Sequence, residues 1–195
     1  SHAYGYGEVQ AEKLSLIPAE MLYSPNISTV YSLEFLGRTV DADLLRSTVG
    51  KNASVGNSPA TSVCCFIIDD GATTVSYFDT IVDEGRIVTV YPFRVFELSW
   101  VLFFLSYSGL PIADLVPTSR LAALYGRRGP AGFALDTTFG ATDGDITSVC
   151  CAVLLMAGYD LDPSILRRFQ DEERHIFRTY GYERNVSVTT NVHAL

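Results

Sequence analysis

The spacing of apolar residues along the chain predicts helices almost throughout. Val75, Phe78 and Val82 recur three and four positions apart, which is the period of one helix face, and they predict a helix over Thr73–Glu84. Apolar residues with similar spacing, bounded by capping residues, prolines or glycines, predict further helices over Lys13–Leu22, Asn26–Gly37, Asp41–Val49 and from near Pro92 to Gly109.

Polar residues and prolines mark the starts of other helices. Ser58 followed by Pro59 is a cap with proline at the first helical position, and Asp162 with Pro163 repeats that signal. "TSRLAALY" predicts a helix before a glycine and proline loop at Gly126–Gly132. "HIFRTYGYERNVS" is the one stretch typical of extended or irregular structure, and "VTTNVHAL" predicts the first turns of a further helix. Helices joined by short loops predict an all-α fold class.

Composition and charge narrow the class of protein. The 195 residues are 48% hydrophobic and 18% charged, which is enough apolar material for a sizeable core. A net charge of −8 argues against nucleic acid as a partner, although it allows a local basic pocket for an anion. The longest apolar stretch, Leu98–Leu105, falls far short of the roughly 20 residues of a membrane helix, so we expect no membrane span.

The four cysteines form two adjacent pairs, Cys64-Cys65 and Cys150-Cys151. They show neither a CxxC motif nor a spacing that suits zinc, so we interpret them as small apolar core residues of a protein in the reducing cytoplasm. Each pair ends a copy of the string TSVCC, at Thr61–Cys65 and Thr147–Cys151. Chance and small-residue packing explain the repeat simply; two related helical units would explain it as equivalent helices.

Two carboxylates, Asp143 and Asp145, precede the apolar run of "DGDITSVCCAVLLMAGYD", which predicts a helix that stops at Gly158. The plain interpretation is a helix cap, because acidic side chains accept the first free N–H groups. The chemical one is a carboxylic acid kept protonated by burial and by a second carboxylate. Such an acid can protonate a carbon–carbon double bond, and aromatic rings then stabilise the cation. The 11 Phe, 11 Tyr and single Trp suit such a pocket, although an aromatic-rich core explains them equally.

Five segments, in order, resemble one protein family. "DGDIT" within "FGATDGDITSVCCAVLLMAGYDLDPSILRRFQDEE" resembles the DxDDTA helix of class II terpene cyclases, the diterpene cyclases of the copalyl-, halimadienyl- and terpentedienyl-diphosphate synthase type. "LIPAEMLYSPNISTVYSLEFLG" resembles their PxxxLHxxPTTLLHSLEG, and "GKNASVGNSPATSVCCFI" their DGSxxxSPSATA. "VYPFRVFELSWVL" resembles their YPxxxFExxWVL, and "IFRTYGYERNVSVTTNVHAL" their FxTYxxERxxSVxTNxHxL. The resemblance extends from about Lys13 to Leu195.

The resemblance implies two α/α-barrel domains, called γ and β, with the class II site between them. Residues 1–112 would be the C-terminal half of the γ-like barrel, and residues 113–195 the DxDD-bearing start of the β-like barrel. The upstream β segment and the first half of γ, with its acidic magnesium motif, have no counterpart here. We therefore expect partial barrels: a fragment, a degenerate short homologue, or the ordered part of something larger, completed by missing cyclase segments or a partner chain.

Residue by residue, the resemblance assigns Asp145 as the general acid, Asp143 as the carboxylate that supports it, and Thr147 as the motif's threonine. Ile146 stands where the family has its last aspartate, and an isoleucine cannot accept a hydrogen bond. Ser148 replaces the alanine. The motif is thus a degenerate DxDD.

Further residues are candidates for binding the substrate. Tyr31 and Thr89 stand where plant copalyl diphosphate synthases have a His and an Asn that position a water base, which implies a different termination. Tyr91 is a pocket candidate at the start of a helix. Trp100 lies four residues after Phe96 on one helix face, where a core role is equally open. Arg184, with Arg178, could contact a diphosphate or lie in an exposed charged loop. His175 and His193 have no partner at catalytic spacing and receive no role.

Two hypotheses follow. In the first, this is a class II terpene cyclase region that binds an isoprenoid diphosphate such as geranylgeranyl diphosphate, with Mg²⁺ held through the diphosphate, and Asp145 protonates the terminal alkene. In the second, it is a non-catalytic cyclase-derived helical module that binds a prenyl chain or a protein partner. Ile146 and the missing magnesium motif favour the second hypothesis, whereas the two aspartates and the neighbouring motifs favour the first.

Overall fold

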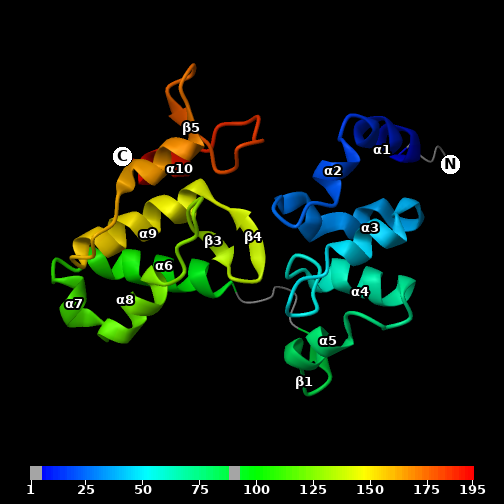
Figure 1. Ribbon diagram of the computed structural model, residues 1–195, viewed down its shortest axis with the longest axis horizontal. Coiled ribbons are helices and arrows are strands. Elements are labelled where there is room, and N and C mark those ends of the chain that lie inside the picture. Colours follow the sequence, from blue (N-terminus) through cyan, green and yellow to red (C-terminus); the bar gives the residue numbers. More distant parts are fainter. Residues whose placement is uncertain (1–5, 88–92) are drawn as a thin grey trace. The chain divides into compact units, whose positions relative to one another are not determined.

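The computed structural model describes residues 6–87 and 93–195, and the chain divides into two compact units, Ser1–Tyr91 and Pro92–Leu195 (Figure 1). Each unit is mainly helical, and the strands are confined to three two-stranded hairpins in the described residues. The boundary expected after residue 112 came from the family resemblance. The helix Arg94–Ser106, expected in the first part, packs within the second unit, and the assignment of the parts to γ-like and β-like barrels stays a prediction.

The first unit is built from short helices and one hairpin. Its elements are α1 (Tyr6–Ser15), α2 (Ala19–Leu22), η1 (Ser28–Thr39), α3 (Ala42–Ser47), α4 (Pro59–Ile68), α5 (Val75–Ile81), β1 (Val82–Asp83) and β2 (Arg86–Ile87). The expected caps of α3 and α4 are confirmed: Asp41 accepts the N–H groups of Asp43 and Leu44, and Ser58 accepts that of Thr61.

Three helix predictions in the first unit are wrong in part. The single helix expected over Lys13–Leu22 is broken, since Pro18 is extended (φ −57°, ψ 139°) and precedes the separate helix α2. The segment expected as an α-helix over Asn26–Gly37 is the 3₁₀ helix η1, with Gly37 at φ 56°. The helix expected to reach Glu84 ends at Ile81, because Glu84 and Gly85 have positive φ and close the β1–β2 hairpin.

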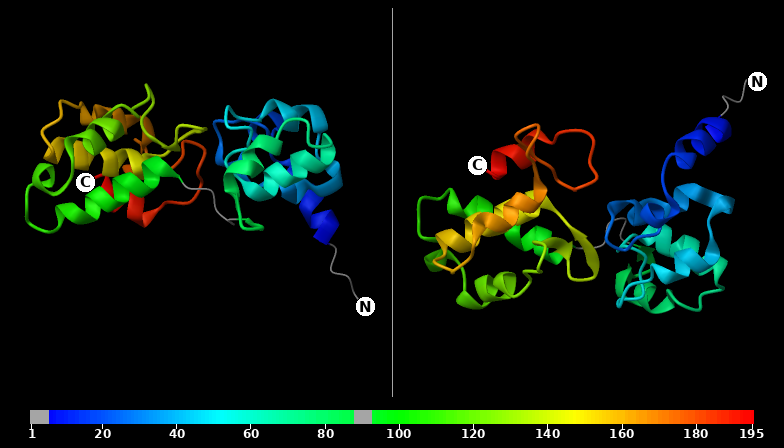
Figure 2. Two further views of the ribbon diagram at one scale, coloured as in Figure 1. Left: turned by 90° about the horizontal axis from the view of Figure 1, so that it is seen from below. Right: turned by 45° about the horizontal axis from the view of Figure 1, so that its top comes forward.

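The second unit is built around two helices of 13 residues, α6 and α9, which pack against each other (Figure 2). Its elements are α6 (Arg94–Ser106), α7 (Ile112–Leu115), α8 (Thr118–Tyr125), β3 (Ala134–Asp136), β4 (Phe139–Thr142), α9 (Gly144–Met156), η2 (Pro163–Phe169), β5 (Gln170–Asp171), β6 (Ile176–Phe177) and α10 (Val188–His193). The irregular stretch expected from His175 and the helix expected after it, α10, are confirmed. The β3–β4 hairpin was not predicted, and the helix expected from Pro163 is the 3₁₀ helix η2, capped by Asp162.

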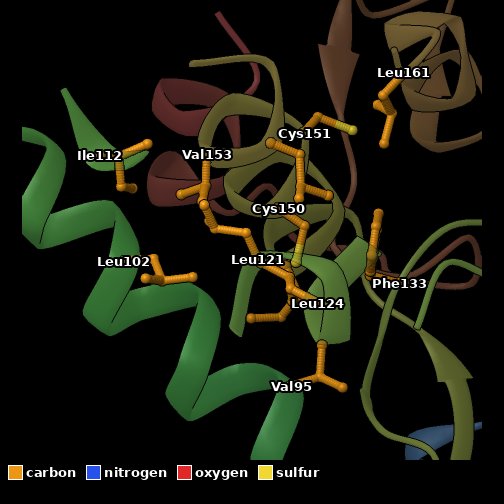
Figure 3. Packing of buried hydrophobic residues seen from close by; sticks show 12 residues of the cluster. Val95, Leu102, Ile112, Leu121, Leu124, Phe133, Cys150, Cys151, Val153 and Leu161 are labelled. Carbon is orange, nitrogen blue, oxygen red and sulfur yellow. The ribbon is translucent and has the colours of Figure 1, made fainter. Parts of the chain in front are cut away.

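The core of the second unit lies where α6, α8 and α9 meet (Figure 3). Leu102 from α6, Leu124 from α8 and Val153 from α9 are at most 1% exposed. All four cysteines are free thiols; Cys65, Cys150 and Cys151 are buried, as expected for core residues, whereas Cys64 is only half-buried. The cytoplasmic location stays a prediction. The core packs along α9 as far as its first turn, where Ile146 belongs to the same cluster.

Candidate active site

The start of α9 is a helix cap whose capping residue is buried. Asp143 Oδ1 accepts the backbone N–H of Ile146 at 2.9 Å, and only 4% of Asp143 is exposed. Burial raises the pKa of Asp143 to about 6, even though the N–H of Ile146 and the hydroxyl of Tyr180 both donate to its carboxylate. The capping role expected from sequence is therefore right, and the cap is also a carboxyl group that holds its proton at mildly acidic pH.

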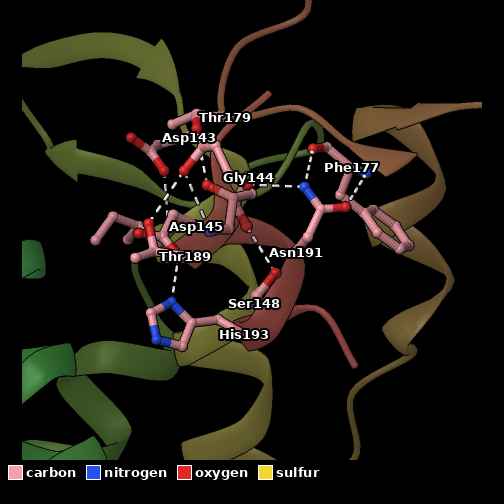
Figure 4. Close-up of polar contacts among 12 residues, drawn as sticks. Asp143, Gly144, Asp145, Ser148, Phe177, Thr179, Thr189, Asn191 and His193 are labelled. Carbon is pink, nitrogen blue, oxygen red and sulfur yellow. Dashed lines mark hydrogen bonds and ion pairs between the residues drawn. The ribbon is translucent and has the colours of Figure 1, made fainter. Parts of the chain in front are cut away.

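Asp145 contacts a histidine from the end of the described chain. Its Oδ1 lies 2.6 Å from Nδ1 of His193, the last residue of α10 (Figure 4). The side chains are 20% and 16% exposed, so the pair is mostly but not wholly removed from water. The imidazole packs edge-on against the rings of Trp100 and Phe103 from α6, with centroid distances of 5.0 and 5.6 Å. The second unit therefore places a carboxyl–imidazole pair beside two aromatic rings.

Thr147 stabilises the first turn of α9 through hydrogen bonds of its hydroxyl. Its hydroxyl donates to the carbonyl of Asp143 at 2.6 Å and accepts the N–H of Phe133 at 3.0 Å, and the residue is fully buried. The hydroxyl thereby ties the segment before the β3–β4 hairpin to the helix start. Thr147 thus holds in place the turn that carries both aspartates.

Ile146, at the family's position for a third aspartate, is a core residue in this chain. It is 1% exposed and belongs to the apolar cluster that includes Val95 and Leu102 of α6. Its side chain therefore packs with apolar neighbours of the helix core. The isoleucine fits this environment, whereas a carboxylate there would lose its hydration.

The other predicted site residues do not all lie near the Asp145–His193 pair. The structure brings Trp100 to the Asp145–His193 pair, as described above. Arg184 is exposed in the loop before α10, and no hydrogen bond or ion pair joins it to either member of the pair in the described residues. Tyr31 is half-buried on η1 of the first unit, where its carbonyl accepts the hydroxyl of Thr61 at 2.9 Å. Thr89 and Tyr91 lie outside the described residues.

Two functional candidates were missed by the sequence interpretation. His193 received no role because no partner was found for it in the sequence; the structure gives it Asp145 as a partner, because α10 packs against α9 and brings it to a residue 48 positions earlier. Tyr180 was not considered; it donates to Asp143, and burial together with that carboxylate raises its pKa. The available signal was that both residues lie in the FxTYxxERxxSVxTNxHxL resemblance, His193 at its histidine and Tyr180 at its tyrosine.

Metal-binding clusters and membrane-spanning helices are both absent from the described residues. These residues contain no cluster of three or more His, Cys, Asp or Glu side chains that could hold a metal ion. None of their helices combines the length and apolar character needed to cross a membrane.

Sequence comparisons find proteins that are similar to part or most of the chain. An uncharacterised protein, y4kT, of Sinorhizobium fredii is 40% identical over 115 residues, which is 57% of this chain and 22% of that protein. The bifunctional cis-abienol synthase of Abies balsamea is 27% identical over 190 residues, 93% of this chain and 21% of the enzyme. No family model matches the chain.

A solved structure gives the fold directly. Ent-copalyl diphosphate synthase of Arabidopsis thaliana, in complex with (S)-15-aza-14,15-dihydrogeranylgeranyl thiolodiphosphate, superimposes with a TM-score of 0.80 at 21% identity, covering 96% of this chain and 27% of that one. The expected all-α fold of the terpene cyclase α/α-barrel type is thereby confirmed. The chain spans about a fifth to a quarter of the length of these relatives.

Proposed function

We propose that this chain carries the acid-bearing part of a class II terpene cyclase. One observation supports it above all: Asp145, at the general-acid position of the resemblance, is paired with His193 at 2.6 Å beside aromatic rings. The fold similarity to ent-copalyl diphosphate synthase supports it independently. The substrate is an isoprenoid diphosphate such as geranylgeranyl diphosphate, which is cyclised with its diphosphate retained.

The reaction begins at the oxygen of Asp145 that the histidine does not occupy. His193 contacts Oδ1, and no hydrogen bond occupies Oδ2 within the described part of the chain. In the proposed step the Oδ2–H bond breaks and the π electrons of the terminal alkene form a C–H bond with that proton. The other alkene carbon becomes a tertiary cation, further π bonds close rings onto it, and the last cation is quenched when an adjacent C–H bond gives its proton to water. Asp145 is left as a carboxylate, which an N–H donor on His193 stabilises.

The aromatic side chains of α6 provide a border for the cation. Trp100 lies against His193 and also contacts Phe103 and Phe104, with centroids 5.7 and 5.6 Å away. The negative face of an aromatic ring attracts a cation by an estimated 0.5–2 kcal/mol, more where water is excluded. We assign Trp100 to this border, and we propose Tyr31, Thr89 and Tyr91 as further substrate-contacting residues.

The diphosphate end of the substrate needs positive charge. Arg184 is proposed to contact it, since a guanidinium binds phosphate oxygens in pairs. Mg²⁺ is proposed to arrive as the counter-ion of the diphosphate, because the described residues offer no metal-ligand cluster of their own. It compensates the charge of the diphosphate and takes no part in the proton transfer.

Additional chain is proposed to complete the barrels. Three large side chains on or directly after α6, Val101, Phe104 and Tyr107, are 57–71% exposed, which is a substantial apolar surface for one helix. Missing cyclase segments or a partner chain that supplies them would cover this surface. The activity test is therefore designed on a chain that carries those segments.

The test is incubation with geranylgeranyl diphosphate and Mg²⁺, followed by phosphatase treatment and product analysis. We expect a cyclised alcohol from the parent chain and its loss in Asp145→Asn. Asp160→Asn, the same change at an exposed carboxylate after α9, is the matched control and should leave the product unchanged. If the parent chain forms no cyclised product, the proposal fails and a non-catalytic module remains.

A further inference from the structure

The segment Phe177–Thr179 lies directly against the first turn of α9. The N–H of Gly144 donates to the carbonyl of Thr179 at 2.8 Å. A Cβ added at Gly144 would come within 2.4 Å of the carbonyl oxygen of Arg178, closer than real Cβ contacts allow. Only a glycine permits this approach, so the backbone of the segment is fixed against the residue that precedes Asp145.

The same segment is bound to α10 by one side chain. Asn191 Oδ1 accepts the N–H of Phe177 at 2.8 Å, and its Nδ2 donates to the carbonyl of Phe177 at 2.8 Å (Figure 4). Nδ2 also donates to the carbonyl of Ser187 at 2.8 Å, within the N-terminal turn of the helix. The amide therefore uses both its donor and its acceptor to join the segment to α10.

His193 is carried by a short helix. The helix α10 is only six residues long, Val188–His193, and an isolated helix of that length is not stable in water. Its remaining side-chain link to the segment is the hydroxyl contact between Thr179 and Thr190 at 2.8 Å. A hydrogen-bonded route from Gly144 to α10 thus runs through the segment Phe177–Thr179 and Asn191, in addition to the direct packing of α10 against α9.

We propose that Asn191 is a positioning residue, which clamps α10 to the segment Phe177–Thr179 and so holds His193 Nδ1 against Asp145. Its consequence for catalysis rests on the proposed function, whereas its consequence for the His193 imidazole does not. If Asn191 only stabilised the end of the chain, its loss would lower the melting temperature and leave the environment of His193 in the folded protein unchanged.

The test is the ¹⁵N spectrum of the His193 ring, which reports the proton position and hydrogen bonding of Nδ1. Asp145→Asn gives the reference spectrum for a lost carboxylate partner. In folded Asn191→Ala and Asn191→Asp, we expect the His193 signals to move from the parent positions toward that reference. Asn191→Asp retains the oxygen that accepts the N–H of Phe177 and removes the two bonds that Nδ2 donates. If Asn191→Ala does not fold, the spectrum of Asn191→Asp tests the proposal. Val188→Ala, at a position 75% exposed on the same helix, is the control and should leave the signals unmoved.

Unchanged His193 signals in a folded Asn191 variant would overturn the proposal. Activity supplies a second readout: we expect kcat to fall roughly 10- to 100-fold with KM little changed, because small misplacements of a catalytic group cost that much. A parent chain without cyclase activity would refute the proposed function and still leave the spectrum to decide the clamp.

Discussion

His193 Nδ1 and Asp145 Oδ1 lie 2.6 Å apart although the two residues are separated by 48 positions in the sequence. One residue belongs to the first turn of α9 and the other ends α10. The contact leaves the second carboxyl oxygen of Asp145 for proton transfer. The proposed mechanism therefore predicts a distinct effect for each change in this pair and in the residues that hold it.

His193→Phe tests the imidazole. The variant retains a ring against Trp100 and removes the nitrogen that contacts Asp145, and a hydrogen bond to a charged group contributes about 1.5–3 kcal/mol. We expect kcat to fall roughly 10- to 100-fold, which is that free energy at 1.4 kcal/mol per factor of ten. His193→Asn, which restores an N–H donor, should recover part of the loss. Equal activity in His193→Phe and the parent would contradict the role assigned to His193.

Asp143→Asn tests the buried cap. The pKa of Asp143 is raised from 3.8 to about 6, so the folded protein binds more protons than the unfolded one between these pH values. The contribution of Asp143 to stability is therefore lost as pH rises from about 4 to about 6. Relative to Asp143→Asn, the free energy of unfolding of the parent should fall by about 2 kcal/mol between pH 4 and pH 7. Denaturant titrations at the two pH values measure it, and a parallel pH dependence in both proteins would refute it.

Ile146→Asp restores the carboxylate of the family motif at a position that is 1% exposed in an apolar cluster. We expect the variant to lose several kcal/mol of stability and to gain no activity, since an unpaired charge is costly to bury. Ile146→Val is the volume control and should cost about 0.5–1.5 kcal/mol. Thermal melts of both variants check this, and an Ile146→Asp protein as stable as the parent would show that the side chain can reach water or a partner.

Thr147→Val removes the hydroxyl that joins Phe133 to the start of α9. The buried N–H of Phe133 then lacks its 3.0 Å partner, which costs about 1–3 kcal/mol. Thr61→Val is the matched change at the first TSVCC copy, in the other unit. The single tryptophan, Trp100, lies in the second unit, so its fluorescence midpoint in urea should shift more for Thr147→Val. A larger shift for Thr61→Val would refute the assignment.

Local signals made much of the fold predictable. The caps at Ser58, Asp143 and Asp162 were found because a capping side chain and its N–H partner lie within three residues of one another. The 3₁₀ form of η1 and the short hairpins were not predicted. Contacts with neighbouring segments outweigh the weak local preference of a sequence for one secondary structure. Apolar spacing alone does not separate a long helix from a shorter one that is followed by a tight turn.

The candidate site was predictable only in part, for a related reason. The motif identified Asp143, Asp145 and Thr147, which share one turn. The partners come from distant positions: His193 contacts Asp145 across 48 positions, and the hydroxyl of Tyr180 donates to Asp143. Such contacts depend on how the helices pack, and the spacing of apolar residues does not indicate which polar residues come into contact.

The central claim is that Asp145 delivers a proton to an alkene carbon, and deuterium labelling tests it most directly. With geranylgeranyl diphosphate and Mg²⁺ in D₂O, Asp145 exchanges its proton for deuterium before it reacts. The account predicts a cyclised alcohol, after phosphatase treatment, with one deuterium bound to carbon by mass spectrometry, and no such product from Asp145→Asn. A cyclised product without carbon-bound deuterium, or the same labelled product from Asp145→Asn, would contradict it.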